Sequence, residues 1–466
     1  MSASAIASDF PVVPEGPPGW PVVGHLPMMK GGGMLPFLER SWHAYGDVFS
    51  VNLGGPMVVV SHPEGIKRVL AGNAKNYVKG RTYDQFRRIV GNGLIALEGP
   101  AWKARRTLMQ PAFHRGSLSK LTEAMAESGR HHFDALRKRN GTAAFRLDAH
   151  RNMVELTLDV VVAALFGREL TSAAHVSYEA LGAALELVSE RSNGVVLPEW
   201  IPTPGNRKFH RTMKEVDAAV FRVIEAGRKT GGGEGTLLSM LINSRDAETG
   251  APLTDRELRD EIFTMFIAGH ETTALTLTWL FTLLVGRDDV LDRMRAEVDT
   301  VLGDRDPQFE DFPKLPYLRQ VIDETLRLRS PVAMNARTAV HDDDLMGFRV
   351  NAGDVVMPFF YAVHRHPEFW KEPDTFDPDR FTADQNRARD PWSYLPFAAG
   401  SRQCIGNMFS LVETVVLLAQ LLRRFDVVVD TDLVQVKPLA MVTVRPDRPV
   451  MITLRARKGP ERGRLE

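Results

Sequence analysis

Apolar and polar positions near the N-terminus first follow a helical pattern and then alternate. Residues 35–45 have the pattern of a short amphipathic helix, which Gly46 ends. Apolar and polar residues then alternate over residues 48–53 and 57–60, on either side of the pair Gly54-Gly55. Alternation around such a turn indicates a β-hairpin. We therefore expect a helix followed by a hairpin at the start of the chain.

The next part of the chain is predicted to be mostly helical. Residues 63–70 begin a helix, and residues 119–228 keep a helical period with breaks at residues 140–141 and 197–205. Residues 72–99 contain five glycines and show no clear period, so we interpret them as a long irregular loop. Loops of this length inside a compact domain are commonly functional.

The longest helical pattern begins at Thr254. Glu257 follows three residues later, which is the signature of a capping box, and the helix continues for about 30 residues with apolar side chains on most faces. Such a helix should cross the core. Residues 268–273 (Ala-Gly-His-Glu-Thr-Thr) place a glycine and polar side chains in this buried setting. Glycine costs ~1 kcal/mol inside a helix and buried polar groups need partners. The cluster is either a kink with satisfied polar groups or a functional site.

The C-terminal part mixes helices with short strands. A helix that ends at Arg329 follows a loop at residues 307–316, and strands are expected between residues 344 and 358. Another helix runs to about Arg424. Two strand-like pieces lie within residues 433–455 and are separated by residues 445–449.

Composition and charge narrow the class of protein. A chain of 466 residues would by length form two or three domains. Lys plus Arg equals Asp plus Glu, at 58 each, so no global charge favours nucleic acid or an anionic membrane. The N-terminus lacks the features of a signal peptide, and no segment reaches the ~18 apolar residues of a membrane span. One cysteine excludes an intramolecular disulfide and fits a reducing compartment. We expect a cytoplasmic protein without a membrane anchor.

The single cysteine, Cys404, lies in an unusual stretch, residues 397–406. A lone cysteine is most often a small buried hydrophobic residue. In this stretch, however, Gly400 and Gly406 free the backbone on both sides, so that amide groups can turn toward the sulfur. Arg402 adds a positive charge. A thiolate stabilised in this way is a metal ligand or a nucleophile.

The same stretch resembles the haem-binding loop of the cytochrome P450 family, Phe-x-x-Gly-x-Arg-x-Cys-x-Gly, with Phe397 in the first position. Four other features of that family occur in the same order along the chain: Trp102 with Arg106, the stretch Ala268–Thr273, Glu324 with Arg327, and Arg380. The resemblance implies a single triangular domain, mainly α with small β-sheets, that has a long central distal helix and spans residues 11–456. A flexible N-terminus (1–10) and a charged tail (457–466) would flank it.

The resemblance also implies roles for individual residues. Cys404 would be the axial ligand of haem b (iron protoporphyrin IX), and Glu271 and Thr272 would deliver protons to dioxygen. Glu324, Arg327 and Arg380 would brace the fold. The remaining cofactor contacts would be Trp102, Arg106, Arg337, Arg402, Phe397, Gly400, Gly406, Ala268 and Gly269. Two positions depart from the family pattern: Ala398, where glycine or serine is usual, and Ser410, where alanine is usual.

On the helix with Trp102 and Arg106, two more cations, Lys103 and Arg105, point elsewhere. They are either solvated charges or a docking surface for an acidic electron donor. Arg81 or Arg87 would be able to hold a substrate carboxylate, although ordinary surface arginines are the simpler interpretation.

The implied activity is haem-thiolate monooxygenation in secondary metabolism. Electrons would come from a separate ferredoxin and its NAD(P)H-dependent ferredoxin reductase. The implied substrate is a lipophilic terpenoid, steroid or fatty-acid-like molecule, because the expected pocket residues are apolar: Phe86, Phe263, Ile267, Val332, Met334 and Met441. The alternatives are a peroxide-driven or non-oxygenating haem-thiolate enzyme and a non-catalytic haem sensor.

Overall fold

The computed structural model describes residues 14–29, 33–167, 183–184, 187, 198–233, 236–245 and 250–457. The expected N-terminal tail at 1–10 and all but the first residue of the expected tail at 457–466 lie outside these residues, as does residue 197 of the helix break expected at 197–205. The chain groups into two compact units, which are described separately. Unit 1 comprises residues 1–83, 332–375 and 387–404, and unit 2 comprises residues 84–331, 376–386 and 405–466.

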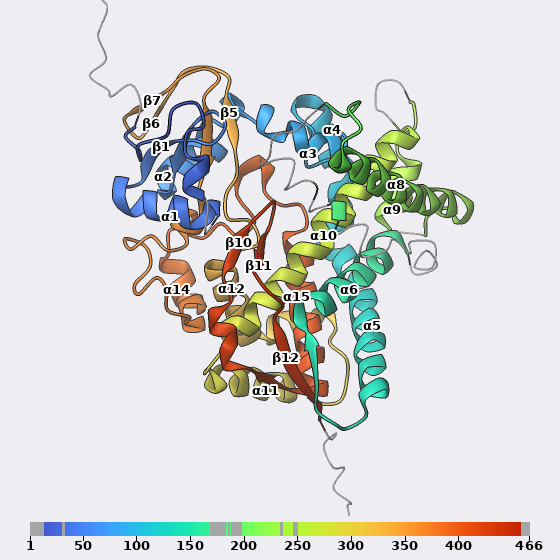
Figure 1. Ribbon diagram of the computed structural model, residues 1–466. Helices are drawn as coiled ribbons and strands as arrows, with labels where there is room; N and C mark the ends of the chain where they lie inside the picture. The colour runs from blue at the N-terminus through green and yellow to red at the C-terminus, as the bar shows by residue number, and fades with distance from the viewer. Residues whose placement is uncertain are drawn as a thin grey trace, which may run out of the picture. The chain divides into compact units, whose positions relative to one another are not determined.

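Unit 1 contains a small sheet with short helices (Figure 1). Its helices are α1 (Met34–Tyr45), α2 (Pro63–Lys67), which continues as the π-helical turn η2 (Arg68–Gly72), and α13 (Phe360–Val363). Its strands are β1 (Val48–Asn52), β2 (Pro56–Val60), β3 (Tyr77–Val78), β5 (Arg337–Ala339), β6 (Asp343–Leu345), β7 (Phe348–Val350) and β8 (Val355–Pro358). Helix α14 (Ala383–Ala388) contains the boundary between the units.

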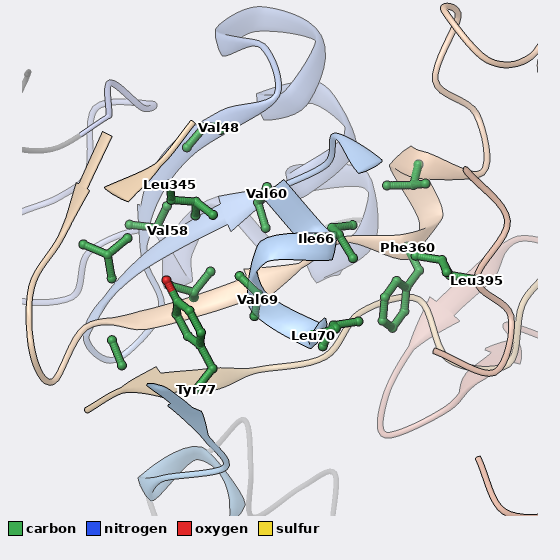
Figure 2. Close-up of a cluster of buried hydrophobic side chains, with 14 residues drawn as sticks. Val48, Val58, Val60, Ile66, Val69, Leu70, Tyr77, Leu345, Phe360 and Leu395 are labelled. Atoms are coloured by element: carbon green, nitrogen blue, oxygen red, sulfur yellow. The ribbon is translucent and has the colours of Figure 1, made fainter. Parts of the chain in front are cut away.

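The predicted N-terminal helix and hairpin are confirmed. β1 pairs antiparallel with β2, and β2 pairs in parallel with β8, which gives a five-stranded sheet in the order β1-β2-β8-β5-β3. Alternate strand residues such as Val58 and Val60 turn inward, where they meet Ile66 and Leu70 of the following helical turns (Figure 2). Apolar burial of this kind is the main force that holds the unit together.

The interpretation of residues 72–99 as irregular throughout is wrong. This stretch holds β3, a 3-10 turn at Arg81–Tyr83 and helix α3 (Asp84–Val90). Helix α3 is only seven residues long, so it shows too few helical periods to stand out between glycines. Only residues 91–98 form the connection from α3 to the next helix.

Unit 2 is predominantly helical (Figure 1). Besides α3, its helices are α4 (Gly99–Met109), α5 (Arg115–Asn140), α6 (Ala149–Val161), which continues as the π-helical turn η6 (Val162–Phe166), α8 (Pro204–Thr230), α9 (Leu237–Asn243), α10 (Asp255–Leu283), α11 (Asp288–Leu302), α12 (Pro316–Leu328) and α15 (Asn407–Arg424). Its strands are β4 (Phe145–Asp148), β9 (Phe425–Val429), β10 (Pro438–Ala440), β11 (Val444–Pro446) and β12 (Met451–Ala456).

Helix α10 crosses the middle of unit 2, as its sequence predicts. It has 29 residues, and the capping box of Thr254 and Glu257 is formed. Helices α6, α8, α12 and α15 pack around it, and its helical backbone continues through residues 268–273. Packing on every side explains why apolar side chains occupy most of its faces.

The C-terminal strands differ from the prediction in one detail. Arg445 and Pro446 lie in β11, which pairs with β10 as a hairpin, whereas they were expected in a connection between strands. The last strand, β12, instead joins β4 and β9 in a three-stranded sheet. In the part of the chain that the structure describes, no helix combines the length and apolar character needed to cross a membrane.

Candidate active site

The central part of helix α10, between its accessible ends, is almost entirely buried. Every residue from Leu258 to Phe281 is buried except Ala268, Gly269 and Thr272. Residues four apart lie one above the other on a helix, so Ala268 and Thr272 share a face, with Gly269 beside them. The accessible part of α10 therefore coincides with the small and hydroxyl residues that the sequence singled out.

Gly269 has a packing reason as well. A Cβ atom at this position would lie 2.8 Å from Cγ2 of Val161 on α6, so a side chain would push the two helices apart. Close by, the Thr157 hydroxyl of α6 donates a hydrogen bond to the carbonyl oxygen of His270 at 2.9 Å. The role of Gly269 at a cofactor stays a prediction. The structure shows that it permits the close approach of α6 and α10.

Thr272 and Thr276 lie one turn apart on α10. They make the same kind of hydrogen bond but differ in accessibility. Its hydroxyl donates to the carbonyl oxygen of Ala268 at 3.0 Å, and the hydroxyl of Thr276 donates to the carbonyl oxygen of Thr272 at 3.0 Å. Thr276 is 3% exposed, whereas Thr272 is only half-buried. A hydroxyl that donates one proton still has lone pairs that accept another. Thr272 is thus able to pass a proton at the accessible part of α10.

Glu271 is held in a buried ion pair. Its carboxylate accepts from Nε of Arg445 at 2.5 Å, from Nη2 of the same guanidinium at 2.9 Å, and from the Thr443 hydroxyl at 3.1 Å. Burial alone would raise the pKa of Glu271, but the bidentate charge of Arg445 outweighs it and holds the pKa below its ordinary value. Glu271 is therefore a carboxylate anion at neutral pH.

Sequence reasoning missed Arg445. Met441 is expected in the pocket, but residues 445–449, which contain Arg445, are predicted only to separate two strands. The pairing of β10 with β11 brings Thr443 and Arg445 back onto α10, 172 and 174 residues away along the chain from Glu271. An arginine in a strand next to a hairpin tip is a weak signal, because most such arginines are solvated.

The cysteine stretch ends unit 1, and Cys404 is exposed. Its backbone N–H donates to the carbonyl oxygen of Phe397 at 3.0 Å, which closes the loop on itself. Gly400 has a left-handed φ of 72°, and a Cβ there would lie 2.1 Å from the backbone oxygen of Leu70 in η2. Glycine is thus required at this position, both for its backbone angle and for its close approach.

Ala398 in the same loop also has a left-handed conformation, with φ 54°. This is the position where the sequence departs from the usual glycine or serine. A left-handed alanine costs roughly 1–2 kcal/mol. Ala398 packs against the core of unit 1, which offsets part of this cost.

A second departure, Ser410, makes a contact that alanine would not make. Its hydroxyl lies 3.1 Å from the hydroxyl of Thr273, so it joins α15 to α10 one residue beyond Thr272. Glu413, one turn further along α15, is completely buried. Burial raises the pKa of Glu413 well above its ordinary value, which favours the protonated carboxyl.

Helix α4 carries Trp102 and Arg106, both half-buried. Arg105, between them in sequence, is not part of a solvated or docking surface, so both sequence interpretations of it are wrong. It is 8% exposed, and its guanidinium donates to Glu261 and Glu257 of α10 at 2.6 and 3.1 Å. Lys103 is exposed.

The residues expected to brace the fold are in contact. Arg327 donates to both oxygens of Glu324 at 2.6 and 2.7 Å, and both side chains are completely buried. Nε of Arg380 lies 3.6 Å from Glu324, which also accepts from the backbone N–H of Asp377 at 2.9 Å. In unit 1, Arg337 is buried and donates to Asn335 at 2.6 Å. Their roles at a cofactor or in support of it stay predictions.

The expected pocket residues fall in both units. Val332, Met334, Phe86 and Met441 are half-buried, and Ile267 is 6% exposed. Phe263 is completely buried, and the guanidinium carbon of Arg259 lies 4.8 Å from its ring centroid.

Of the two arginines considered for a substrate carboxylate, Arg87 donates to Asp84 at 3.0 Å, and Arg81 is exposed.

These residues fit an iron porphyrin. The exposed cysteine thiolate is a ligand type that haem iron takes, and its loop is held in shape by hydrogen bonding and by the core of unit 1. Between residues 258 and 281 of α10, the accessible residues are Ala268, Gly269 and Thr272, all with small side chains. Each of these two segments, taken by itself, has the chemistry that the sequence predicts for a haem-thiolate protein.

Comparison with known proteins places the chain in one family. The family model described as Cytochrome P450 matches residues 14–454. A cyclooctat-9-en-7-ol 5-monooxygenase of Streptomyces melanosporofaciens is 34% identical, with 87% of each chain covered. A pentalenene oxygenase of Streptomyces avermitilis is 32% identical, with 94% of this chain and 96% of the relative covered. The crystal structure of the cytochrome P450DA heme domain has a TM-score of 0.86 at 28% identity, with 97% of this chain and 99% of that chain covered.

The chain therefore belongs to the cytochrome P450 family. It is an oxidoreductase of the monooxygenase class that carries haem, as the cysteine loop indicates. The sequence expectations of a mainly helical fold with small sheets and of a haem-thiolate monooxygenase are both confirmed.

Proposed function

We propose that this monooxygenase inserts one oxygen atom from dioxygen into a terpenoid. The observation that carries the proposal is the likeness to three relatives named for such reactions: the cyclooctat-9-en-7-ol 5-monooxygenase, a cyclooctatin synthase of the same organism at 33% identity, and the pentalenene oxygenase. The apolar character of Phe86, Ile267 and Met441 supports a hydrocarbon substrate over a charged one. Steroids and fatty acids are the competing lipophilic classes.

We propose haem b as the form of the cofactor, with Cys404 as its axial ligand. The thioether attachment of c-type haem uses cysteine side chains, and the only cysteine in this chain would be committed to the iron. Trp102, Arg106, Arg337 and Arg402 would hold the propionates through N–H donors. When bound, the haem supplies the oxygen activation, and the thiolate donates electron density that favours O–O cleavage.

The protein's own part in the chemistry is the movement of protons at α10. The hydroxyl of Thr272 is positioned to hold a proton and pass it on, since it is accessible and already donates along the helix. Glu271 would in turn supply protons to Thr272. Because Arg445 and Thr443 hold its carboxylate, Glu271 must leave or loosen this pair before it takes a proton.

We further propose that a separate ferredoxin and its NAD(P)H-dependent reductase supply the electrons. Monooxygenation consumes two electrons that the haem and the protein do not generate, so a redox partner has to deliver them. Because NAD(P)H is a cytoplasmic reductant, we propose that the enzyme acts in the cytoplasm.

The Glu271–Arg445 pair also favours a second candidate, a peroxide-driven reaction. A carboxylate that is fixed as an anion is not ready to donate a proton, and peroxide already contains the protons that dioxygen would need. The two candidate reactions differ in whether product formation requires the hydroxyl of Thr272.

Thr272→Ala is expected to lower product formation by about 10²-fold, the lower end of the usual contribution of acid–base catalysis, while NAD(P)H consumption continues. The measurement is product formed per NAD(P)H consumed with ferredoxin and reductase. Thr276→Ala is the matched control, because it removes the same kind of hydroxyl one turn away from the accessible stretch. An unchanged ratio in Thr272→Ala would show that its hydroxyl does not deliver the proton, and product formation with hydrogen peroxide in place of NAD(P)H, ferredoxin and reductase would favour the peroxide-driven candidate.

The substrate class is tested by titrating the ferric enzyme with sesquiterpenes, diterpenes, steroids and fatty acids. Binding beside the haem displaces water from the iron and changes its spin state, which the absorption spectrum reports. We expect saturable shifts with terpenoids at concentrations at least tenfold lower than with fatty acids, about 1.4 kcal/mol of preference. Tighter binding of fatty acids would overturn the terpenoid proposal and leave the monooxygenase class intact.

A further inference from the structure

The connection from α3 to α4, residues 91–98, is fastened to the first half of α10. The carboxylate of Asp260 accepts from the backbone N–H of Asn92 at 2.8 Å, and the carboxylate of Glu261 accepts from the backbone N–H of Leu94 at 2.9 Å. Two adjacent acidic residues of one helix thus each bind one amide of the same loop. We refer to residues 91–98 as the α3–α4 loop.

Two glycines allow the loop to come this close. A Cβ at Gly91 would lie 2.1 Å from the carboxylate carbon of Asp260, and one at Gly93 would lie 2.0 Å from Oγ1 of Thr264. Gly91 also has a left-handed φ of 67°. The backbone of the loop therefore lies directly on α10 with no side chain between.

The same carboxylates fasten the elements on either side of the loop. Arg105 of α4 donates to Glu261 at 2.6 Å and to Glu257 at 3.1 Å. On the other side, Arg259 donates to Asp260 at 3.0 Å and to the carbonyl oxygen of Ile89 in α3 at 3.1 Å. Both ends of the loop are therefore held to α10 by charged side chains.

Glu261 is completely buried. Its charge state therefore depends on whether the α3–α4 loop stays bound to α10. Burial raises its pKa from 4.5 to about 7, and the charge of Arg105 and the amide of Leu94 keep it from rising further.

In the described part of the chain, the other charged groups near Glu261 lie on α10 and α8. Asp260 and Glu257 lie on its own helix, Arg259 and Arg256 bind Asp260, and Asp217 of α8 binds Arg259. Helix α9 packs against α4 and has no ionisable side chain.

We propose that Asp260 and Glu261 are positioning residues that clamp the α3–α4 loop and helix α4 onto α10, and that opening of this clamp releases a proton from Glu261. Arg105 is the third member of the clamp. Trp102 and Arg106 lie on the same helix as Arg105, so the clamp also fixes the part of α4 that carries them. This inference does not depend on the substrate or on the electron donor.

The direction of the pH dependence follows from the two states of Glu261. In the closed clamp the carboxyl binds its proton up to about pH 7, whereas in an open, solvated loop it would lose the proton above its ordinary value of 4.5. Opening therefore releases a proton between these values, and the opening equilibrium constant should rise about tenfold per pH unit across this window. It should level off above pH 7. Protonation thus locks the loop, and neutral pH loosens it.

The test is hydrogen exchange of the holoenzyme, followed by mass spectrometry of peptides that cover residues 92–97. After correction for the intrinsic pH dependence of exchange, the opening constant of wild type should increase about tenfold from pH 5.5 to 6.5. Glu261→Gln keeps the acceptor and the shape but cannot titrate, so its opening constant should be low and independent of pH. Asp260→Asn is the matched control, which should loosen the loop but retain the slope.

A pH-independent opening constant in wild type, or the same slope in Glu261→Gln, would overturn the proposal. If Glu261→Gln does not accumulate as holoenzyme, Arg105→Met provides the second test. Removal of the guanidinium that lowers the pKa of Glu261 should extend the slope above pH 7. A slope that still ends at pH 7 in this variant would contradict the clamp.

Discussion

Replacement of Cys404 by serine is expected to abolish the long-wavelength Soret band of the reduced, carbon-monoxide-bound enzyme, together with product formation. The thiolate of Cys404 would donate electron density strongly to the haem iron, whereas a serine hydroxyl is a poorer donor that stays protonated at neutral pH. Cys404 is exposed and serine is close to it in size, so the variant should fold normally. The absorption spectrum and the melting temperature, measured on the same preparation, separate ligation from folding.

Ser401→Ala is the matched control for this variant. Ser401 is exposed in the same loop and is not one of the expected cofactor contacts. This control should keep the Soret band and the activity. Survival of the band in Cys404→Ser would disprove the assignment of the axial ligand.

The largest expected loss of stability comes from breaking the Glu271–Arg445 pair on one side only. Arg445→Met leaves the carboxylate of Glu271 buried and charged with only the Thr443 hydroxyl as a partner. Removal of one member of a buried ion pair typically costs about 3–5 kcal/mol, because the remaining charge is left without its partner. Urea unfolding of the holoenzyme near pH 7.5 measures this loss.

The sign of the pH dependence provides a second check on the pair. In wild type the pKa of Glu271 is depressed, so its contribution is present above pH 4.5 and is lost as the pH falls through the folded-state pKa. In Arg445→Met the pKa should instead rise, since burial is no longer opposed. The difference in stability between the two proteins should therefore shrink as the pH is lowered toward 5.

The double variant Glu271→Gln/Arg445→Met is the control, because it removes both charges. Neutral replacement of a buried pair is often close to neutral in stability, so this variant should recover most of the loss. Equal destabilisation by the single and double variants would show that the ion pair is not the cause.

Local sequence patterns predicted the elements whose signals lie within a few residues. The capping box of Thr254 and Glu257 and the small residues at Ala268 and Gly269 were recognisable, because a helix repeats its geometry every few positions. The hairpin around Gly54-Gly55 was recognisable for the same reason. Helix α3 was not, because its seven residues contain barely two turns.

The partners of charged residues could not be predicted from local patterns. Arg445 meets Glu271 only after β10 and β11 pair, and the register of that hairpin is not visible in the spacing of either residue. Arg105 was misread for a related reason. The spacing of Trp102 and Arg106 defines one face of α4 but not what covers the other face, where Glu261 lies 156 residues away along the chain.

The conformation of the cysteine loop, residues 397–406, depends on residues outside the loop. Ala398 holds a backbone angle that alanine avoids by itself, and Gly400 is fixed against Leu70, which is more than 300 residues earlier in the chain. Neither feature comes from the loop's own sequence preferences. A short synthetic peptide of residues 397–406 would therefore contain the cysteine and the arginine but would not adopt the conformation of the loop. A minimal haem-binding mimic of this enzyme would also have to include the part of unit 1 that supports the loop.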